Sequence, residues 1–223
     1  MSVNHITKRN GSDVQNSSID QLLYTGMFYK MLETSTASVG YDKYCDSRDN
    51  PMYKNEPYRN ICVTIFNYLK TKYNASNGTD KKYDDCKLLS YWAYSRLFDI
   101  LHKEQYVYLA YAQLHVIWND FIEHLPMNKR CKPIHEMVSY VEWRKRKELY
   151  EYYINYSLIK ELADKYEDKC NEFYEYVKIK LICIKFLTVY VLKIIQIYAQ
   201  NFYKDCEKYN PEKVLYTFKC HKK

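Results

Sequence analysis

The sequence predicts an all-α fold, a single disulfide-braced helical bundle with long loops. Apolar residues recur at helical spacing through most of the 223 residues. Four isolated glycines and five prolines are too few for the many tight turns of an all-β fold. Eight cysteines stand singly, no two closer than 13 residues: Cys45, Cys62, Cys86, Cys131, Cys170, Cys183, Cys206 and Cys220. Their even number and wide spacing favour disulfides in an oxidising compartment over a cytosolic domain with scattered buried thiols.

The first two predicted helices are separated by a long loop. A helix over Ile19–Glu33 follows a capping-box spacing and carries apolar residues on one face. A second helix covers about Tyr58–Tyr73, again with one apolar face. The segment Thr34–Pro57 between them is predicted to be a loop, and a loop of this length needs a tether. A disulfide between Cys45 and Cys62 would supply that tether.

The two most apolar predicted helices follow each other closely. Asp85–Lys103 is apolar almost all round, which suits a central helix, and Gln105–His124 follows after one residue. Such a short connection predicts an antiparallel hairpin, with the start of the first helix beside the end of the second. That geometry makes Cys86 and Cys131 a candidate disulfide.

The next part of the chain is again predicted to be helical, from Ile134 to Tyr153 and then from Ser157 onward. A long amphipathic helix is expected over about Asp168–Lys204, with Cys183 on its apolar side as a candidate buried free thiol. Its predicted polar wedge contains Glu175, Lys178, Lys185, Lys193, Gln196, Gln200 and Lys204.

The C-terminus is expected to end in one more short helix. Asn210-Pro211 is typical of a helix start, because proline is tolerated in the first turn. Cys206 and Cys220 flank this helix, and a disulfide between them would pin the C-terminus.

The net charge of +7 arises mainly from lysines that are interleaved with acidic residues. No nucleic-acid-binding motif accompanies them, so no nucleic-acid partner is expected. The sharpest basic run is Arg144, Lys145, Arg146 and Lys147. This run is interpreted either as a solvated helix face or as a candidate basic patch for anionic glycans or lipid headgroups.

Motifs for catalysis, cofactors and metals are missing from the sequence. Isolated glycines exclude a P-loop or a dinucleotide site, which need clustered glycines near the phosphates. The single cysteines and the histidines lack metal-ligand spacing. We therefore expect no enzyme activity, no catalytic residues, no cofactor and no metal site. A Cys–His nucleophile pair formed only in space remains the open alternative.

The sequence also shows no recognisable targeting signal. Met1–Asn10 has no apolar core of a signal peptide, and the longest uncharged stretch, Gln105–Asn119, has 15 residues where a membrane span needs roughly 20. We expect no signal peptide and no transmembrane helix in this chain. Candidate glycosylation sites lie at the neighbouring sequons of Asn74 and Asn77, and further sequons occur at Asn10, Asn16 and Asn155.

Three passages resemble a known family when they are taken together. They are DCKLLSYWAYSRLF at residues 85–98, RKELYEYYINY at 146–156 followed by Cys170, and FYKDC at 202–206 followed by YNPEKVL at 209–215 and Cys220. Their order and spacing resemble the Plasmodium interspersed repeat proteins, called variant interspersed repeat proteins in the vivax malaria parasite. The resemblance covers about residues 86–220.

Residues 1–17 are polar and rich in Ser and Asn, so a mobile N-terminus is expected there. The resemblance implies a helical ectodomain over residues 18–223. It also implies a variant antigen, exported to the infected erythrocyte, in its host-cell compartment or at its surface. The antigen would bind a host cell-surface protein or glycan, meet antibodies and aid immune evasion. Membrane contact would be indirect or through a segment not present. The rival hypothesis is an intracellular scaffolding protein of the infected cell that contacts membranes through the Lys178–Lys204 helix.

Overall fold

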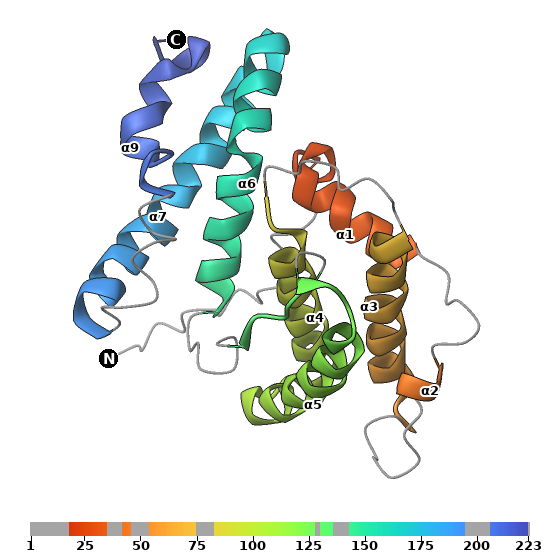
Figure 1. Ribbon diagram of the computed structural model, residues 1–223. Coiled ribbons are helices and arrows are strands. Elements are labelled where there is room, and N and C mark those ends of the chain that lie inside the picture. Colours follow the sequence, from red (N-terminus) through yellow and green to blue (C-terminus); the bar gives the residue numbers. More distant parts are fainter. Residues whose placement is uncertain are drawn as a thin grey trace, which may run out of the picture.

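The computed structural model describes residues 18–34, 42–45, 54–74, 83–127, 130–135, 143–194 and 206–222, and within these ranges it contains helices and no strand (Figure 1). The predicted all-α fold is confirmed. The predicted mobile N-terminus, residues 1–17, lies outside the described residues. The elements are η1 (Asp20–Leu22), α1 (Tyr24–Thr34), α2 (Asp42–Cys45), α3 (Glu56–Asn74), α4 (Asp85–Leu101), α5 (Glu104–Glu123), α6 (Trp143–Lys165), η5 (Glu167–Lys169), α7 (Cys170–Ile194), α9 (Pro211–Val214), η6 (Leu215–Thr217) and η7 (Lys219–Lys222).

The first predicted helix is divided into the 3-10 turn η1 and helix α1. The backbone breaks at Leu23, which is extended. The turn packs back onto α1 so closely that a Cβ on Gly26 would lie 1.8 Å from the carbonyl oxygen of Asp20. Glycine at this position therefore permits the fold-back. The sequence pattern predicted one continuous helix because this close approach leaves no periodic signal.

Helix α3 matches the second predicted helix and is joined to the preceding segment by a disulfide. Cys62 on α3 is bonded to Cys45, as the tethering argument predicts. Cys45 ends a four-residue helix, α2, inside the segment that was predicted to be a loop. The ring of Tyr44 stacks on Phe66 of α3, with ring centroids 5.4 Å apart. The bridge and this stack hold α2 against α3.

Helices α4 and α5 form the predicted hairpin at the centre of the bundle. The Asp84 carboxylate caps α4 by accepting from the backbone N–H groups of Cys86 and Lys87. His102 ends α4 in the left-handed conformation, with φ of 55°, and turns the chain into α5. Cys86 and Cys131 form the expected disulfide across the open end of the hairpin.

Helix α6 differs from its prediction at both ends. It begins at Trp143 rather than Ile134, and it runs without a break through the predicted gap between Tyr153 and Ser157. Residues 130–135 pass along the α4–α5 hairpin instead, where the Ser90 hydroxyl accepts from the backbone N–H of Ile134. The described side chains on two faces of α6 are apolar, so a one-face pattern could not define its length.

The C-terminal pairing of cysteines was predicted wrongly. Cys220 is bonded to Cys170 at the start of α7, not to Cys206. Cys206 is buried and takes no part in the three disulfides of the described residues. The expected short helix α9 is present, with the Asn210 side chain capping it through Glu212 N. Chain proximity suggested the wrong pair, because the folded C-terminus returns to the start of α7 rather than closing locally.

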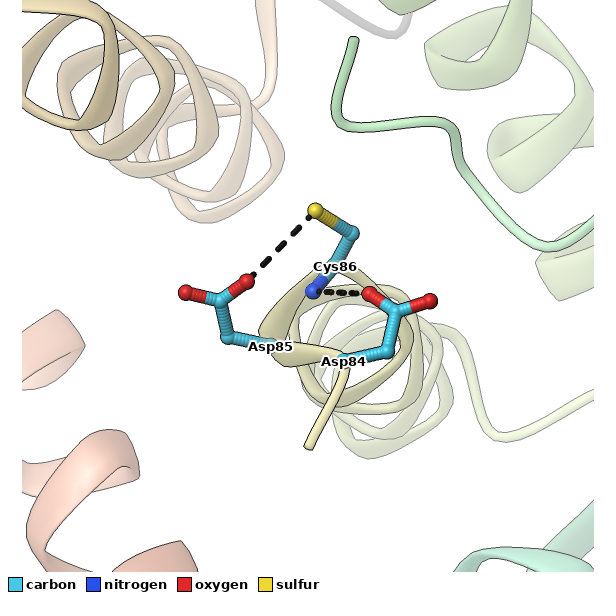
Figure 2. A group of neighbouring side chains, drawn as sticks. All are labelled: Asp84, Asp85 and Cys86. Carbon is cyan, nitrogen blue, oxygen red and sulfur yellow. Dashed lines mark hydrogen bonds between the residues drawn. The ribbon is translucent and has the colours of Figure 1, made fainter. Parts of the chain in front are cut away.

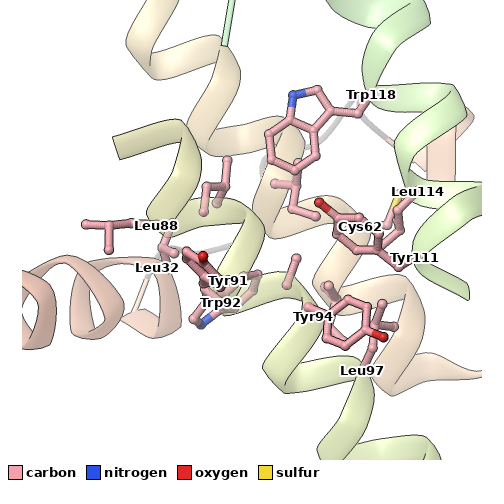
Figure 3. Packing of buried hydrophobic residues seen from close by; sticks show 14 of the residues in the cluster. Leu32, Cys62, Leu88, Tyr91, Trp92, Tyr94, Leu97, Tyr111, Leu114 and Trp118 are labelled. Carbon is pink, nitrogen blue, oxygen red and sulfur yellow. The ribbon is translucent and has the colours of Figure 1, made fainter. Parts of the chain in front are cut away.

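Two hydrophobic cores share α6. The first core contains buried side chains of α1 to α5 together with the start of α6, and Figure 3 shows its centre around Trp92, Tyr111 and Trp118. The second core contains Leu149, Tyr152, Tyr156 and other residues of α6 packed against α7 and the C-terminal turns. Figure 1 shows α6 and α7 side by side, with α9 on their outer side and α3 to α5 across the molecule. None of the described helices has the length and apolar character to cross a membrane.

Candidate functional site

Among the described residues, one group of side chains has metal-type ligand atoms close together, at the start of α4 (Figure 2). It contains Asp84, Asp85 and Cys86. Asp84 is the N-cap of α4, and Asp85 forms an ion pair with Lys72 on α3 while accepting a 2.5 Å hydrogen bond from the Tyr68 hydroxyl. These contacts join α3 to α4.

The chemistry of this group fits a structural role better than a metal centre. The sulfur of Cys86 belongs to a disulfide, and a thiolate is the form of cysteine that binds metals. The Lys72 ammonium group pairs with the Asp85 carboxylate, and its nitrogen lies 3.1 Å from the Cys86 sulfur. A positive charge therefore already occupies the place where a metal ion would meet these ligands. The prediction of no metal site still awaits a direct test.

Several buried tyrosine hydroxyls form hydrogen bonds inside the fold. The Tyr150 hydroxyl donates to the Asp84 carbonyl at 2.8 Å, and that of Tyr152 donates to the Tyr209 carbonyl at 2.6 Å. The Tyr29 hydroxyl donates to the Glu151 carboxylate at 2.6 Å. Burial, and then the Glu151 charge, raises the pKa of Tyr29 well above its ordinary value. These tyrosines therefore connect helices rather than form an adhesive surface.

The candidate basic patch does not form one exposed surface. Arg146 and Lys147 are buried, whereas Arg144 is exposed and Lys145 half-buried. The Lys147 ammonium lies 2.7 Å from Glu151, and the Arg144 guanidinium lies over the Phe98 ring at 4.1 Å from its centroid. A helix turns its successive residues by about 100°, so four consecutive charges cannot all face solvent on a helix that packs on two sides.

The sequons have different surroundings. Asn155 is fully buried and its amide is bonded to Thr25, so an oligosaccharyltransferase cannot reach it in the folded chain. Asn74 is the last residue of α3, and its side chain lies outside the described part of the chain. Asn77, Asn10 and Asn16 lie outside the described residues altogether. Glycosylation at Asn74 and Asn77 stays a prediction.

A shallow hollow of about 230 Å³ lies between α3 and α4. Its lining residues are Pro57, Asn60, Ile61, Thr64, Trp92, Arg96, Asp99 and Ile100. Arg96 on its rim forms ion pairs with Glu33 and Asp99. The volume is below the roughly 300–1,000 Å³ of typical ligand pockets, and no histidine or cysteine lines the hollow. It does not support an active site.

Two helices carry exposed apolar faces that the predicted site residues did not include. On α1, Tyr24, Met27 and Met31 are exposed at spacings of three and four residues. On α5, Leu109 and Val116 are exposed seven residues apart. Helical periodicity identifies the buried face of such helices. The uncharged stretch Gln105–Asn119 was the sequence signal for the apolar outer face of α5.

The described residues of the predicted amphipathic helix Asp168–Lys204 lie mainly on α7. Phe173 and Val177 of α7 are buried against α6, whereas Glu175, Lys178 and Lys185 of the predicted polar wedge are exposed. Lys178 pairs with Glu175, and Lys185 pairs with Glu212. The side chain of Cys183 and residues 195–204, which complete the predicted helix, lie outside the described part of the chain.

A family model described as the Plasmodium vivax Vir protein matches residues 23–223 of the chain. This match spans all three passages on which the resemblance rests. No curated protein and no solved structure matches the chain.

Proposed function

Because the chain belongs to the Plasmodium vivax Vir protein family, we propose that it is a variant antigen that is exported to the infected erythrocyte and binds a host protein. The observation that carries this proposal is the family match over residues 23–223. Export and binding would expose the chain to antibodies, and sequence variation on its outer surface would then aid immune evasion. The three disulfides support the proposal that the chain resides in an oxidising compartment.

A host protein is favoured over an anionic glycan as the binding partner. Glycan sulfates and carboxylates need several exposed cations on one surface. The run from Arg144 to Lys147 is instead divided between the core, an ion pair and an aromatic stack. We therefore expect no retention on heparin at physiological salt, and charge reversal at Arg144 should leave that behaviour unchanged.

The exposed face of α1 has the chemistry of a protein-binding surface. Met27 is 49% exposed and Met31 45%, and Tyr24 lies on the same face. Methionine side chains are flexible and polarisable and adapt to irregular apolar surfaces, whereas tyrosine is enriched at binding hot spots. We assign this face to an apolar patch on a host cell-surface protein.

Binding of the purified, oxidised chain to erythrocytes and other human host cells tests the proposal. The double variant M27E/M31E should bind at least about tenfold more weakly, because each introduced carboxylate would be buried in the interface without a partner charge. The matched control I179E changes an exposed apolar residue of α7 and should bind like the original chain. Absence of saturable binding, or equal binding by M27E/M31E, would contradict the assignment.

The rival scaffolding function needs a free apolar face on α7. Phe173 and Val177 lie just before the Lys178–Lys204 segment and are buried in the second core, whereas Ile179 within that segment is 58% exposed. Co-sedimentation with liposomes containing phosphatidylserine separates the two functions: the antigen should stay in the supernatant, and a pelleted chain would favour the scaffold.

A further inference from the structure

Two histidine side chains from different segments lie side by side in the folded chain. His115 is a half-buried residue of α5, and His135 is the exposed last residue of the 130–135 segment. Their ring centroids are 5.0 Å apart, with an angle of 57° between the ring planes. The two residues are far apart in sequence and lack the spacing of a metal-binding motif, so only the fold brings them together.

Four contacts hold the segment that ends at His135 against the α4–α5 hairpin. Its Cys131 forms a disulfide with α4 and accepts, at its carbonyl, an indole N–H of α5 at 2.7 Å. Its Ile134 donates its backbone N–H to a serine hydroxyl of α4 and accepts a tyrosine hydroxyl of α5, both at 3.1 Å. The partners on the hairpin are Cys86, Ser90, Tyr111 and Trp118. Since His115 belongs to α5, these contacts also set the distance between the two imidazoles.

The separation of the two rings matches that of two imidazole ligands on one metal ion. An imidazole nitrogen binds Zn²⁺ at about 2.0–2.1 Å, and the ligands take a tetrahedral arrangement. Together with the distance from the nitrogen to the centre of its ring, this geometry places two ring centres about 5 Å apart. The 5.0 Å between His115 and His135 is therefore the separation that a shared zinc ion requires.

Asn119 lies where it can orient the His115 ring. Its amide nitrogen is 2.9 Å from Nδ1 of His115 and 3.5 Å from Nε2, so Nδ1 is the closer contact. An imidazole that binds a metal through Nε2 carries a proton on Nδ1 and donates it to an oxygen atom. A half-turn of the Asn119 amide presents its oxygen to that proton. The amide would then stabilise the tautomer in which Nε2 is available to a metal.

We propose that His115 and His135 together bind one zinc ion or a chemically similar divalent cation, each through one imidazole nitrogen. Among the described residues, no cysteine, histidine or carboxylate joins this pair as a third ligand. Water would hold the remaining positions, since His135 is exposed. Two protein ligands hold zinc less tightly than the four of structural sites, so we expect a dissociation constant in roughly the micromolar range. The ion would add a link between α5 and the 130–135 segment.

Isothermal titration of the full oxidised chain with zinc chloride tests the proposal. One zinc ion per chain should bind, and calcium should not compete because it prefers oxygen ligands. The variants H115Q and H135Q should each bind zinc at least about tenfold more weakly. The double variant H115Q/H135Q should lose little more than either single variant, because one substitution already removes the shared coordination. The control H124Q changes an exposed histidine at the end of α5 and should bind like the original chain.

Nuclear magnetic resonance of the histidine side chains tests whether both rings hold the same ion. Zinc should shift the imidazole nitrogen signals of His115 and His135 together and leave that of His102 in place. Zinc affinity that H135Q leaves unchanged, a shift of one ring without the other, or one zinc per two chains would overturn the proposal, as would the absence of binding at millimolar zinc. Circular dichroism of each variant verifies that the helical fold is retained.

Discussion

Replacing Asn155 with alanine tests how α6 holds the N-terminal helix. The Asn155 side chain is fully buried, and its amide nitrogen donates to the Thr25 hydroxyl at 2.7 Å. Its amide oxygen accepts from the backbone N–H of Thr25 at 3.3 Å. Thr25 is the second residue of α1, and its N–H therefore has no partner within the helix. Asn155 thus acts as a remote cap for α1, 130 residues away in sequence.

The expected cost of N155A follows from these two hydrogen bonds. The variant leaves the buried N–H and hydroxyl of Thr25 without their partner, and each unsatisfied buried group costs about 1–3 kcal/mol. We expect a loss of about 3 kcal/mol in the free energy of unfolding, which corresponds to a fall in melting temperature of roughly 6–12 °C for a chain of this size. The variant T25V removes one of the same bonds, so the two losses should not be additive.

Urea unfolding of the oxidised chain, followed by circular dichroism, measures this cost. The control N171A changes an exposed asparagine on α7 and should alter stability by less than about 0.5 kcal/mol. A loss below about 0.5 kcal/mol in N155A, or full additivity with T25V, would refute the remote cap.

Two further predictions concern the second core and its disulfide. Burial raises the pKa of Tyr152, so above the ordinary tyrosine pKa of about 10 the unfolded chain loses a proton that the folded chain keeps. The stability that this group contributes is complete below pH 10 and should fall by up to about 1.4 kcal/mol per pH unit above it. When unfolding is measured from pH 9 to 11, the stability of Y152F should fall less steeply than that of the original chain. An unchanged slope would contradict the role given to the Tyr152 hydroxyl. The double variant C170S/C220S opens a loop with a sequence separation of 50 and should lose about 4 kcal/mol, whereas a loss below about 1 kcal/mol would show that the bridge does not constrain the unfolded chain.

The sequence predicts helices well where one face is apolar and a cap is local. Helix α4 begins at the predicted Asp85 because the neighbouring Asp84 supplies its cap, and α9 begins beside Asn210 for the same reason. The need to tether a long loop predicted the disulfide at Cys62, and the geometry of the hairpin predicted the disulfide at Cys86. Each of these features depends on residues close in sequence or on adjacent helices.

Features that depend on distant contacts were not predictable in this way. Helix α6 has apolar residues toward both cores, so its continuous run past Tyr153 leaves no single stripe. The burial of Lys147 depends on Glu151 together with the Tyr29 ring of α1, whose position the sequence does not reveal. The role of Asn155 was hidden for the same reason, since its partner lies in α1. Only the folded chain shows which outer faces remain apolar.

Three specific disulfides brace the helical bundle, and buried polar groups such as Asn155 join its helices. Mass-spectrometric mapping of disulfide-linked peptides from the non-reduced chain tests this bracing most directly. The structure predicts the pairs Cys45–Cys62, Cys86–Cys131 and Cys170–Cys220. A crosslinked peptide that joins Cys206 to Cys220, or free thiols at Cys86 and Cys131 in the folded chain, would contradict it.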